Sequence, residues 1–308
     1  MVPFDRMLLV ANPTSGGGKA GRWVERVAEA FRQEGCGVEI LLTSGAGQAR
    51  EAAGRCQLPL IVVFGGDGTF NEVLNGADLE RTTLAVVPAG TGNVLAKELG
   101  MSQHPLRAVR QLLGGRTVVL DACTCNGRLF SCMFGAGIDA AVVDRVHSRR
   151  RGGLTQWHYV PHTVACTLGS SRWRIDVTVD GQPFAQGMSQ VALGNTHSYG
   201  GPIEMTPAAS PADGLLDVMC MRFGGLIDTC RKAAACALRR LHRTRGVLYG
   251  HGRRMVVSSD CDVPYELDGD PGGRLPAEVE VLPASMGLLA PASFQPLGPP
   301  AADAPTGQ

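Results

Sequence analysis

The chain has 308 residues, of which 44% are hydrophobic and 19% charged, and its formal net charge at pH 7 is +1. This length suits two domains with separate cores, and the composition is that of a globular protein. The near-neutral charge gives no support to a nucleic acid as partner. No apolar run is long enough to span a bilayer, so any contact with a membrane is expected at its surface.

The cysteines do not form a recognisable metal or disulfide pattern. Ten cysteines occur without a CxxC pair, which argues against a zinc ribbon. No signal peptide or cystine-like spacing is evident, so a reducing cytoplasm is the expected compartment. Cys123 and Cys125 share one face of an apparent strand, where packing is the expected role.

Strands and helices alternate over the first 120 residues. The runs MLLVAN, VEILLT, LIVVFGG and LAVVPAG predict four strands, with helices from about Lys19 to Gln33 and from the NVLAKEL stretch. Near-continuous Val, Ile and Leu runs are typical of strands that are buried on both faces. We therefore predict an α/β nucleotide-binding domain over residues 1–120, with a parallel sheet and helices on both faces.

The second half has a different character. After Arg116, short strand-like runs are closed by turn residues, and helical stretches near 139–170 and 225–243 interrupt them. This pattern predicts a mainly antiparallel β-sandwich over residues 121–283. A strand near 284–291 is a candidate to return to the first domain. The Pro/Ala-rich tail, residues 295–308, is predicted to be disordered.

Three glycine loops, residues 12–21, 62–76 and 88–93, each follow a predicted strand. Loops at the carboxyl ends of parallel strands converge on one crevice, which is the usual ligand site of this architecture. Free backbone N–H groups and helix N-termini there suit an anion, so a nucleotide phosphate site is predicted. The first loop is not a Walker loop, because Pro13 and Ala20 replace the required Gly and Ser or Thr.

The second loop carries Asp67, a carboxylate at a place that suits anions. One interpretation is that Asp67 caps the helix beginning near Thr69. A second glycine pattern, GAGIDA at residues 135–140, resembles a dinucleotide fingerprint, but no acidic strand end follows about 20 residues later. We interpret GAGIDA as a tight turn that packs a helix onto the second domain.

The stretches NPTSGGGK, GGDGTFNEVLNG and PAGTGNVLAKEL resemble the diacylglycerol/sphingosine-type lipid kinases, particularly the bacterial soluble ones. GAGIDAAVV, ALGNTHSYGG, PAASPADGLLDV and YELDGDPGG continue the family order as far as about Pro291. The GGDGT pattern is shared with NAD kinases, whereas the ordered set is specific. The resemblance implies ATP- and Mg²⁺-dependent phosphorylation of a lipid hydroxyl, of diacylglycerol or a related lipid alcohol.

In this family the acid of GGDG lies beside the ATP phosphates, which implies a catalytic role for Asp67. Two like charges at roughly 4 Å repel by about 4 kcal/mol in an effective dielectric near 20, and Mg²⁺ reverses that sign. The loops and the resemblance together imply the following nucleotide-binding residues: Asn12, Pro13, Thr14, Ser15, Gly16, Lys19, Thr43, Gly65, Gly66, Asp67, Gly68, Thr69, Phe70, Asn71, Glu72, Gly90, Thr91, Gly92 and Asn93.

The acceptor side of the reaction is predicted at the ELDGDPGG stretch. The family pattern is Asp-Gly-Glu, with the catalytic base within the tripeptide, and here Asp270 replaces the Glu. On an extended segment Asp268 and Asp270 would share one face. We expect Asp268 to be the base, with Asp270 second, although the residues alone also fit a solvated turn.

A second, structural Mg²⁺ site is implied by the resemblance at SPADGLLD. Asp213 would supply the carboxylate, and Ser210 and Leu215 would supply oxygens. Judged from the residues alone, Asp-Gly fits a simple turn into the next strand.

Two basic stretches, residues 145–153 and 231–245, are candidates for contact with a membrane. In the second, Ala234, Leu238 and Leu241 have helical spacing. Each stretch also fits an ordinary surface helix, but a lipid substrate favours transient adsorption to anionic lipid. We expect a cytoplasmic protein that is peripheral at the inner membrane surface, and the sequence leaves open whether it forms a homodimer.

Two alternative functions are an NAD kinase and a non-catalytic nucleotide- or lipid-binding regulator. The second alternative is supported only by Asp270.

Overall fold

The computed structural model describes residues 4–148, 173–197 and 204–296. The chain divides into two compact units, and it passes from one to the other twice. The first unit comprises Met1–Ala122 with Ala284–Pro296, and the second contains Cys123–Pro283.

The first unit is built on a parallel sheet. Its strands are β1 (Arg6–Ala11), β2 (Gly37–Leu42), β3 (Leu60–Gly65) and β4 (Thr83–Pro88), joined at the edge by the last part of β16 (Ala277–Ala290). The order is β2-β1-β3-β4-β16, and every pair is parallel. All six residues of β3 are buried, which agrees with the continuous apolar run in the sequence.

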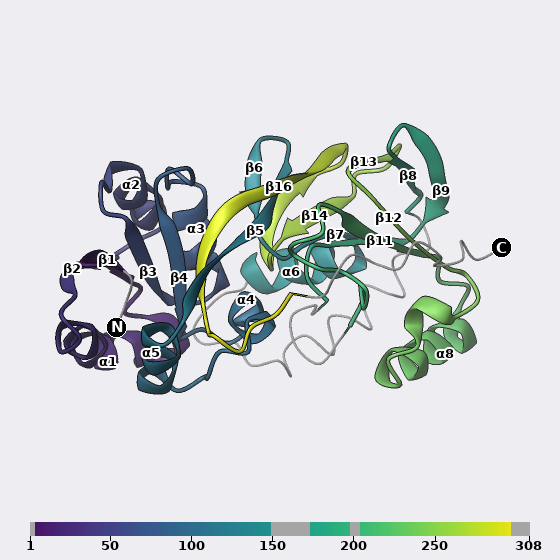
Figure 1. Cartoon of the computed structure of the whole chain (residues 1–308). Helices are drawn as coiled ribbons and strands as arrows, with labels where there is room; N and C mark the ends of the chain where they lie inside the picture. The colour runs from purple at the N-terminus through teal and green to yellow at the C-terminus, as the bar shows by residue number, and fades with distance from the viewer. Residues whose placement is uncertain (1–3, 149–172, 198–203, 297–308) are drawn as a thin grey trace. The chain divides into compact units, whose positions relative to one another are not determined.

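Five helices accompany this sheet: α1 (Ser15–Arg32), α2 (Gln48–Arg55), α3 (Asp67–Leu74), α4 (Val94–Glu98) and α5 (Pro105–Leu113). Helix α1 packs with α5, and α2 packs with α3 on the other side of the sheet (Figure 1). The predicted α/β architecture with a mostly parallel sheet is confirmed.

Helix α1 begins with three glycines that are not helical. Gly16, Gly17 and Gly18 have φ values of 59°, 66° and 84°, in the left-handed region that glycine adopts without a Cβ clash. The regular helix therefore starts at Lys19, as the sequence predicted. The glycines form a separate loop between β1 and the helix.

The strand order creates a switch point beside β1. The chain leaves β1 for β2 on one side, and then crosses back to place β3 on the other side. The loops that follow β1 and β3 consequently leave the carboxyl ends of neighbouring strands in opposite directions. Ligands of open α/β sheets bind at such a point.

The second unit is an antiparallel sandwich of two sheets. One sheet has the order β12-β11-β10-β7-β14-β15. Its strands are β7 (Met133–Gly137), β10 (Gln190–Gly194), β11 (Leu216–Met221), β12 (Val247–Gly252), β14 (Pro264–Leu267) and β15 (Asp270–Arg274). The other sheet includes the first part of β16 together with β8 (Ile175–Val179), β9 (Gln182–Met188), β13 (Arg254–Ser259), the end of β5 (Arg116–Cys125) and β6 (Arg128–Phe130).

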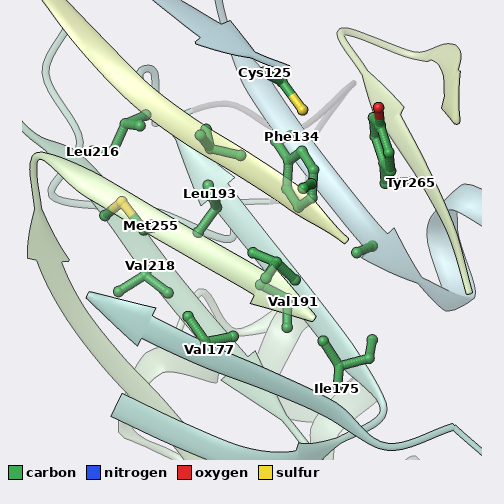
Figure 2. Packing of buried hydrophobic residues seen from close by; sticks show 14 of the residues in the cluster. Cys125, Phe134, Ile175, Val177, Val191, Leu193, Leu216, Val218, Met255 and Tyr265 are labelled. Carbon is green, nitrogen blue, oxygen red and sulfur yellow. The ribbon is translucent and has the colours of Figure 1, made fainter. Parts of the chain in front are cut away.

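The core of this unit lies between the two sheets. Val191 and Val218 of the first sheet face Val177 and Met255 of the second, as Figure 2 shows. Cys125 is buried in the same cluster, so the packing role expected for it is confirmed. Interdigitation of two inner faces is the packing of aligned sandwiches.

Among the described residues, the helices of the second unit are α6 (Ile138–Ser148), α8 (Leu226–Ala237) and the short 3₁₀ helix η3 (Leu241–Arg243). The helical stretch expected near 225–243 is therefore not one continuous helix: α8 ends at Ala237, and η3 follows it. Arg239 adopts φ 54°, a left-handed conformation that ends helices, and Leu241 turns inward to be 3% exposed. The rest of the helical stretch expected near 139–170, much of the basic stretch 145–153 and the tail 297–308 lie outside the described residues.

Within the described ranges, none of the helices has the length and apolarity required to cross a bilayer.

Candidate functional site

The three glycine loops of the first unit pack directly against one another. A Cβ on Gly16 would lie 2.0 Å from the carbonyl oxygen of Ala89, and a Cβ on Gly90 would lie 2.6 Å from the Cα of Gly66. Real Cβ atoms do not come so close to backbone, so both positions require glycine. The loops after β1, β3 and β4 thus meet at one edge of the sheet.

Hydrogen bonds hold the loops in this arrangement. The Gly65 carbonyl accepts the N–H groups of Ala89, at 2.8 Å, and of Gly90, at 3.3 Å. The Asn12 amide donates to the Thr69 hydroxyl at 3.4 Å, so the first loop is joined to the second. Residues from all three sequence-predicted loops are therefore brought together within the first unit.

Asp67 connects the second loop to the third. Its carboxylate accepts the backbone N–H of Val94 at 2.7 Å, at the start of α4. Helix α3 itself begins at Asp67, and its N-cap residue is Gly66, which has no side chain. Asp67 is therefore not the N-cap residue of its own helix, and its carboxylate reaches the helix that begins 27 residues later.

Two buried amides in these loops have polar atoms without a partner among the described residues. Asn71 is 3% exposed, and neither its oxygen nor its nitrogen makes a hydrogen bond there. Asn93 donates to Gly90 and to the Gln103 side chain, at 2.8 Å each, while its oxygen has no partner in the described part of the chain. An unsatisfied buried polar atom costs about 1–3 kcal/mol, so both amides fit a polar ligand that would satisfy them.

Other predicted residues serve the local structure. The Lys19 ammonium donates to the Gln103 carbonyl at 2.6 Å, and burial lowers its pKa. Glu72 accepts the N–H of Ala49 at the start of α2, and Thr43 donates its backbone N–H to the end of β1. Phe70 is a core residue, 1% exposed. Of these four, Lys19 alone presents a group suited to phosphate.

The Asp268–Gly269 pair forms the turn of a β-hairpin in the second unit. Leu267 pairs with Asp270 across it, and both turn residues have positive φ, 51° and 85°. This is the geometry of the tight hairpin turns that Asp-Gly favours. The expectation that Asp268 and Asp270 share a face on an extended segment is therefore wrong.

The Asp268 carboxylate is buried and surrounded by donors. It accepts the backbone N–H groups of Ser131, Cys132 and Met133 at 2.8–2.9 Å, and the Ser131 hydroxyl at 3.1 Å. Asp268 thus fixes the segment that leads into β7. Asp270, by comparison, is half-buried at the first position of β15.

Two further acids near this hairpin escaped the sequence analysis. Glu266 is 2% exposed and accepts the Gly269 N–H at 2.5 Å, which holds the tip of the turn. Burial, and then the charge of Asp139, raises the pKa of Glu266 well above its usual value. Burial likewise raises the pKa of Asp139 to about 6. The sequence did offer a signal for each of them: Glu266 lies two residues before the Asp-Gly turn, and Asp139 is the acid within GAGIDA.

The GAGIDA stretch comprises the end of β7 and the start of α6, joined directly at Gly137. Gly135 and Ala136 lie within β7, and α6 follows directly at Ile138 after Gly137, whose φ is 108°. Helix α6 packs on β7, β14 and β15, so the expected packing of a helix onto the second unit is confirmed.

The residues proposed for a structural metal lie at the start of β11. Asp213 accepts the Leu215 N–H at 2.9 Å, in the turn that the residues alone suggested, and Ser210 is fully buried. Burial raises the pKa of Asp217 to about 7, and the nearby charge of Asp213 contributes to that rise. A cation bound near these acids would relieve their mutual repulsion. The described residues hold no cluster of three His, Cys, Asp or Glu ligands, and the predicted set needs only one carboxylate.

Comparisons with known proteins match both halves of the chain. Residues 6–125 match the diacylglycerol kinase catalytic domain, and residues 132–290 match the YegS C-terminal NAD kinase beta sandwich-like domain. The diacylglycerol kinase of Bacillus subtilis (strain 168) is 31% identical over 282 residues, which are 89% of this chain and 93% of that protein.

A second relative, the diacylglycerol kinase of Mycobacterium tuberculosis (strain ATCC 25618 / H37Rv), is 28% identical over 94% of this chain and 96% of its own length. A crystal structure of a diacylglycerol kinase from Bacillus anthracis str. Sterne has a TM-score of 0.77 at 23% identity. It covers 94% of this chain and 98% of that one, and this likeness concerns the fold. With both domains matched in order and a relative above 30% identity, the chain belongs to the diacylglycerol kinase family of lipid kinases.

Proposed function

We propose that this protein transfers the γ-phosphoryl group of ATP, with Mg²⁺, to the hydroxyl of diacylglycerol or a related lipid alcohol. It acts as a cytoplasmic protein at the inner membrane surface. The observation that carries the proposal is the meeting of three glycine loops near Asp67 and the buried amide of Asn71, which has no hydrogen-bond partner in the part of the chain that the structure describes. These groups offer backbone N–H donors and a buried amide to a nucleotide.

The glycine loops supply the phosphate-binding part. Phosphoryl transfer is mainly a matter of positioning and charge neutralisation, so groups that are already ordered before the nucleotide binds lower the barrier most. Gly16, Gly17 and Gly92 have no side chain to cover the backbone at this edge, whereas the N–H groups of Gly18 and Gly90 are already engaged by Thr14 and Gly65. The Lys19 ammonium lies at the end of the first loop.

Mg²⁺ bound to ATP neutralises the charge that develops on the transferred phosphoryl group. Asp67 suits a place beside that ion, because its carboxylate is already oriented by the Val94 N–H and therefore needs no reorganisation. Asp213, Ser210 and Leu215 would hold the second, structural Mg²⁺ in the other unit, where the charge of Asp213 already disfavours ionisation of Asp217.

On the acceptor side, we assign the base to Asp270 rather than to Asp268. A general base must take the proton of the attacking hydroxyl. Asp268 is buried, at 7% exposed, and its two oxygens already accept hydrogen bonds from four donors, so we place the attacking hydroxyl at the half-buried Asp270 instead. Asp268 is then a positioning residue that fixes the hairpin, with Glu266 holding its tip through Gly269.

The direct test is an assay of the purified protein with labelled ATP, Mg²⁺ and a panel of acceptors. The panel contains diacylglycerol, a sphingoid base, a polyprenol, phosphatidylglycerol and NAD. We expect label in a lipid product. Label in NAD alone would make the protein an NAD kinase, and nucleotide binding without any product would make it a non-catalytic regulator.

We predict that Asp67→Asn keeps the fold but lowers kcat by on the order of 100-fold or more. The Asn oxygen still accepts the Val94 N–H, so only the charge is lost. Steady-state kinetics and thermal unfolding measure the two effects. Turnover equal to that of the wild type in the folded variant would reduce Asp67 to a helix cap.

A second prediction concerns Gly92. A Cβ at this position would lie 2.8 Å from the Asp67 carboxylate, so Gly92→Val should displace Asp67 and abolish binding of an ATP analogue in calorimetry. Gly45→Val is the matched control, because a Cβ there has no neighbour within 4 Å, and it should bind normally. Normal affinity of Gly92→Val would remove this loop from the nucleotide site.

The third prediction separates the two acids of the hairpin. Asp270→Asn should lower kcat about 100-fold or more at unchanged ATP-analogue affinity, whereas Asp270→Glu should stay active. Asp268→Asn replaces one acceptor oxygen by an NH₂ that faces the N–H donors of the Ser131–Met133 segment, so it should lower the melting temperature and leave the pH profile of kcat unchanged. A fully folded, inactive Asp268→Asn beside an active Asp270→Asn would return the base to Asp268.

A further inference from the structure

Helix α8 presents large apolar side chains to solvent at both of its ends. Ile227 is 88% exposed and Leu238, directly after the helix, is 69% exposed. Among the described residues these are the two most exposed large hydrophobic side chains, ahead of Val119 at 56% and Leu42 at 51%. Such exposure costs free energy in water unless another surface covers the side chains.

The two side chains belong to one stripe. Eleven residues separate them, which is three helical turns within about 20°. Cys230 and Ala234 lie between them on the same side, and both are exposed. The stripe, defined here as Ile227, Cys230, Ala234 and Leu238, therefore runs along the whole helix. It differs from the one expected from the sequence, because Leu241 is buried and cannot belong to it.

Positive charge is concentrated on α8 and in the segment that follows it. Residues 226–245 contain six Lys or Arg residues and a single acid, Asp228. Asp228 is already engaged by Arg231 at 2.6 Å and by the buried Lys232. Beyond the helix, Arg240, Arg243 and Arg245 are exposed, and Arg239 pairs with Glu204. The segment as a whole carries an excess of positive charge around an apolar line.

We propose that α8 docks the protein on an anionic membrane, with Ile227 and Leu238 inserted at the boundary between head groups and acyl chains. The inference rests on the proposed function, since a lipid substrate brings the protein to such a surface. Charge decides the occupant, because the exposed arginines that follow the stripe are attracted to anionic head groups. The small Cys230 and Ala234 between the two anchors favour shallow adsorption in the membrane plane.

The test measures sedimentation of the full chain with vesicles, without ATP or diacylglycerol. Vesicles of phosphatidylglycerol with phosphatidylcholine are compared with phosphatidylcholine alone. The double variant Ile227→Gln/Leu238→Gln should lower binding to anionic vesicles at least about tenfold, since burying one large aliphatic side chain changes an equilibrium by that factor or more. The matched control, Leu42→Gln/Val119→Gln, removes comparable apolar exposure elsewhere and should bind like the wild type.

Charge is tested separately. Arg239→Gln/Arg240→Gln/Arg243→Gln should flatten the dependence of binding on phosphatidylglycerol and on salt, which screens over about 8 Å at physiological ionic strength. The proposal would be overturned if the wild type, the Ile227→Gln/Leu238→Gln variant and the triple arginine variant all bound anionic vesicles equally. Wild-type binding that is equally strong to neutral vesicles would overturn it as well. A dimer in light scattering that is lost in Ile227→Gln/Leu238→Gln would assign the stripe to a second copy of the chain instead.

A kinase assay with diacylglycerol in detergent micelles keeps this inference apart from the proposed function. Both the Ile227→Gln/Leu238→Gln variant and the triple arginine variant should retain wild-type activity in micelles, because residues 226–243 include none of those placed in the nucleotide or acceptor sites. Loss of micellar activity in a folded α8 variant would overturn the docking role. A wild type that phosphorylates no lipid in micelles would refute the proposed function, while the sedimentation result would still decide on α8.

Discussion

The close approach of Gly66 and Gly90 is the constraint on which the nucleotide-binding unit depends. Neither position can accept a Cβ without displacing the other loop, so the second and third loops are in backbone contact. The Asp67 carboxylate then reaches the Val94 N–H, and the same contact orders the start of α4. A side chain that forms a catalytic charge in our proposal is thus also a structural link, which explains why an acid is tolerated at the edge of an anion site.

The second unit uses a carboxylate in a similar way. Asp268 lies in a turn whose backbone favours Asp-Gly, and its side chain gathers three consecutive backbone N–H groups from the segment before β7. The hairpin is thereby fixed on both sides, and Glu266 holds the tip through Gly269. Asp67 is itself assigned to chemistry in our proposal, and Asp268 lies two residues before the proposed base, so an ordered, hydrogen-bonded carboxylate is part of each site and lowers the reorganisation that the reaction requires.

Much of the fold, and the meeting of the glycine loops, could be predicted from the sequence, because the local sequence pattern and the structure agree there. Continuous Val and Ile runs predicted the parallel strands, and strands in parallel predicted that their glycine loops would meet. Long-range partners could not be predicted, such as the bond from Asp67 to Val94, because nothing local encodes them. Asp268 shows a signal that was misjudged, since Asp-Gly favours a tight hairpin turn over an extended segment. The end of α8 at Ala237 could not be predicted from the sequence, because the Ala, Leu and Arg residues around it all favour helix.

The central claim is that the three glycine loops form one nucleotide site in the first unit. Amide hydrogen exchange with and without a non-hydrolysable ATP analogue and Mg²⁺ tests it most directly, because exchange reports each loop separately. The account predicts that exchange slows together in residues 13–19, 65–70 and 89–94. Protection of only one of these loops, or protection at residues 133–140 in their place, would contradict it.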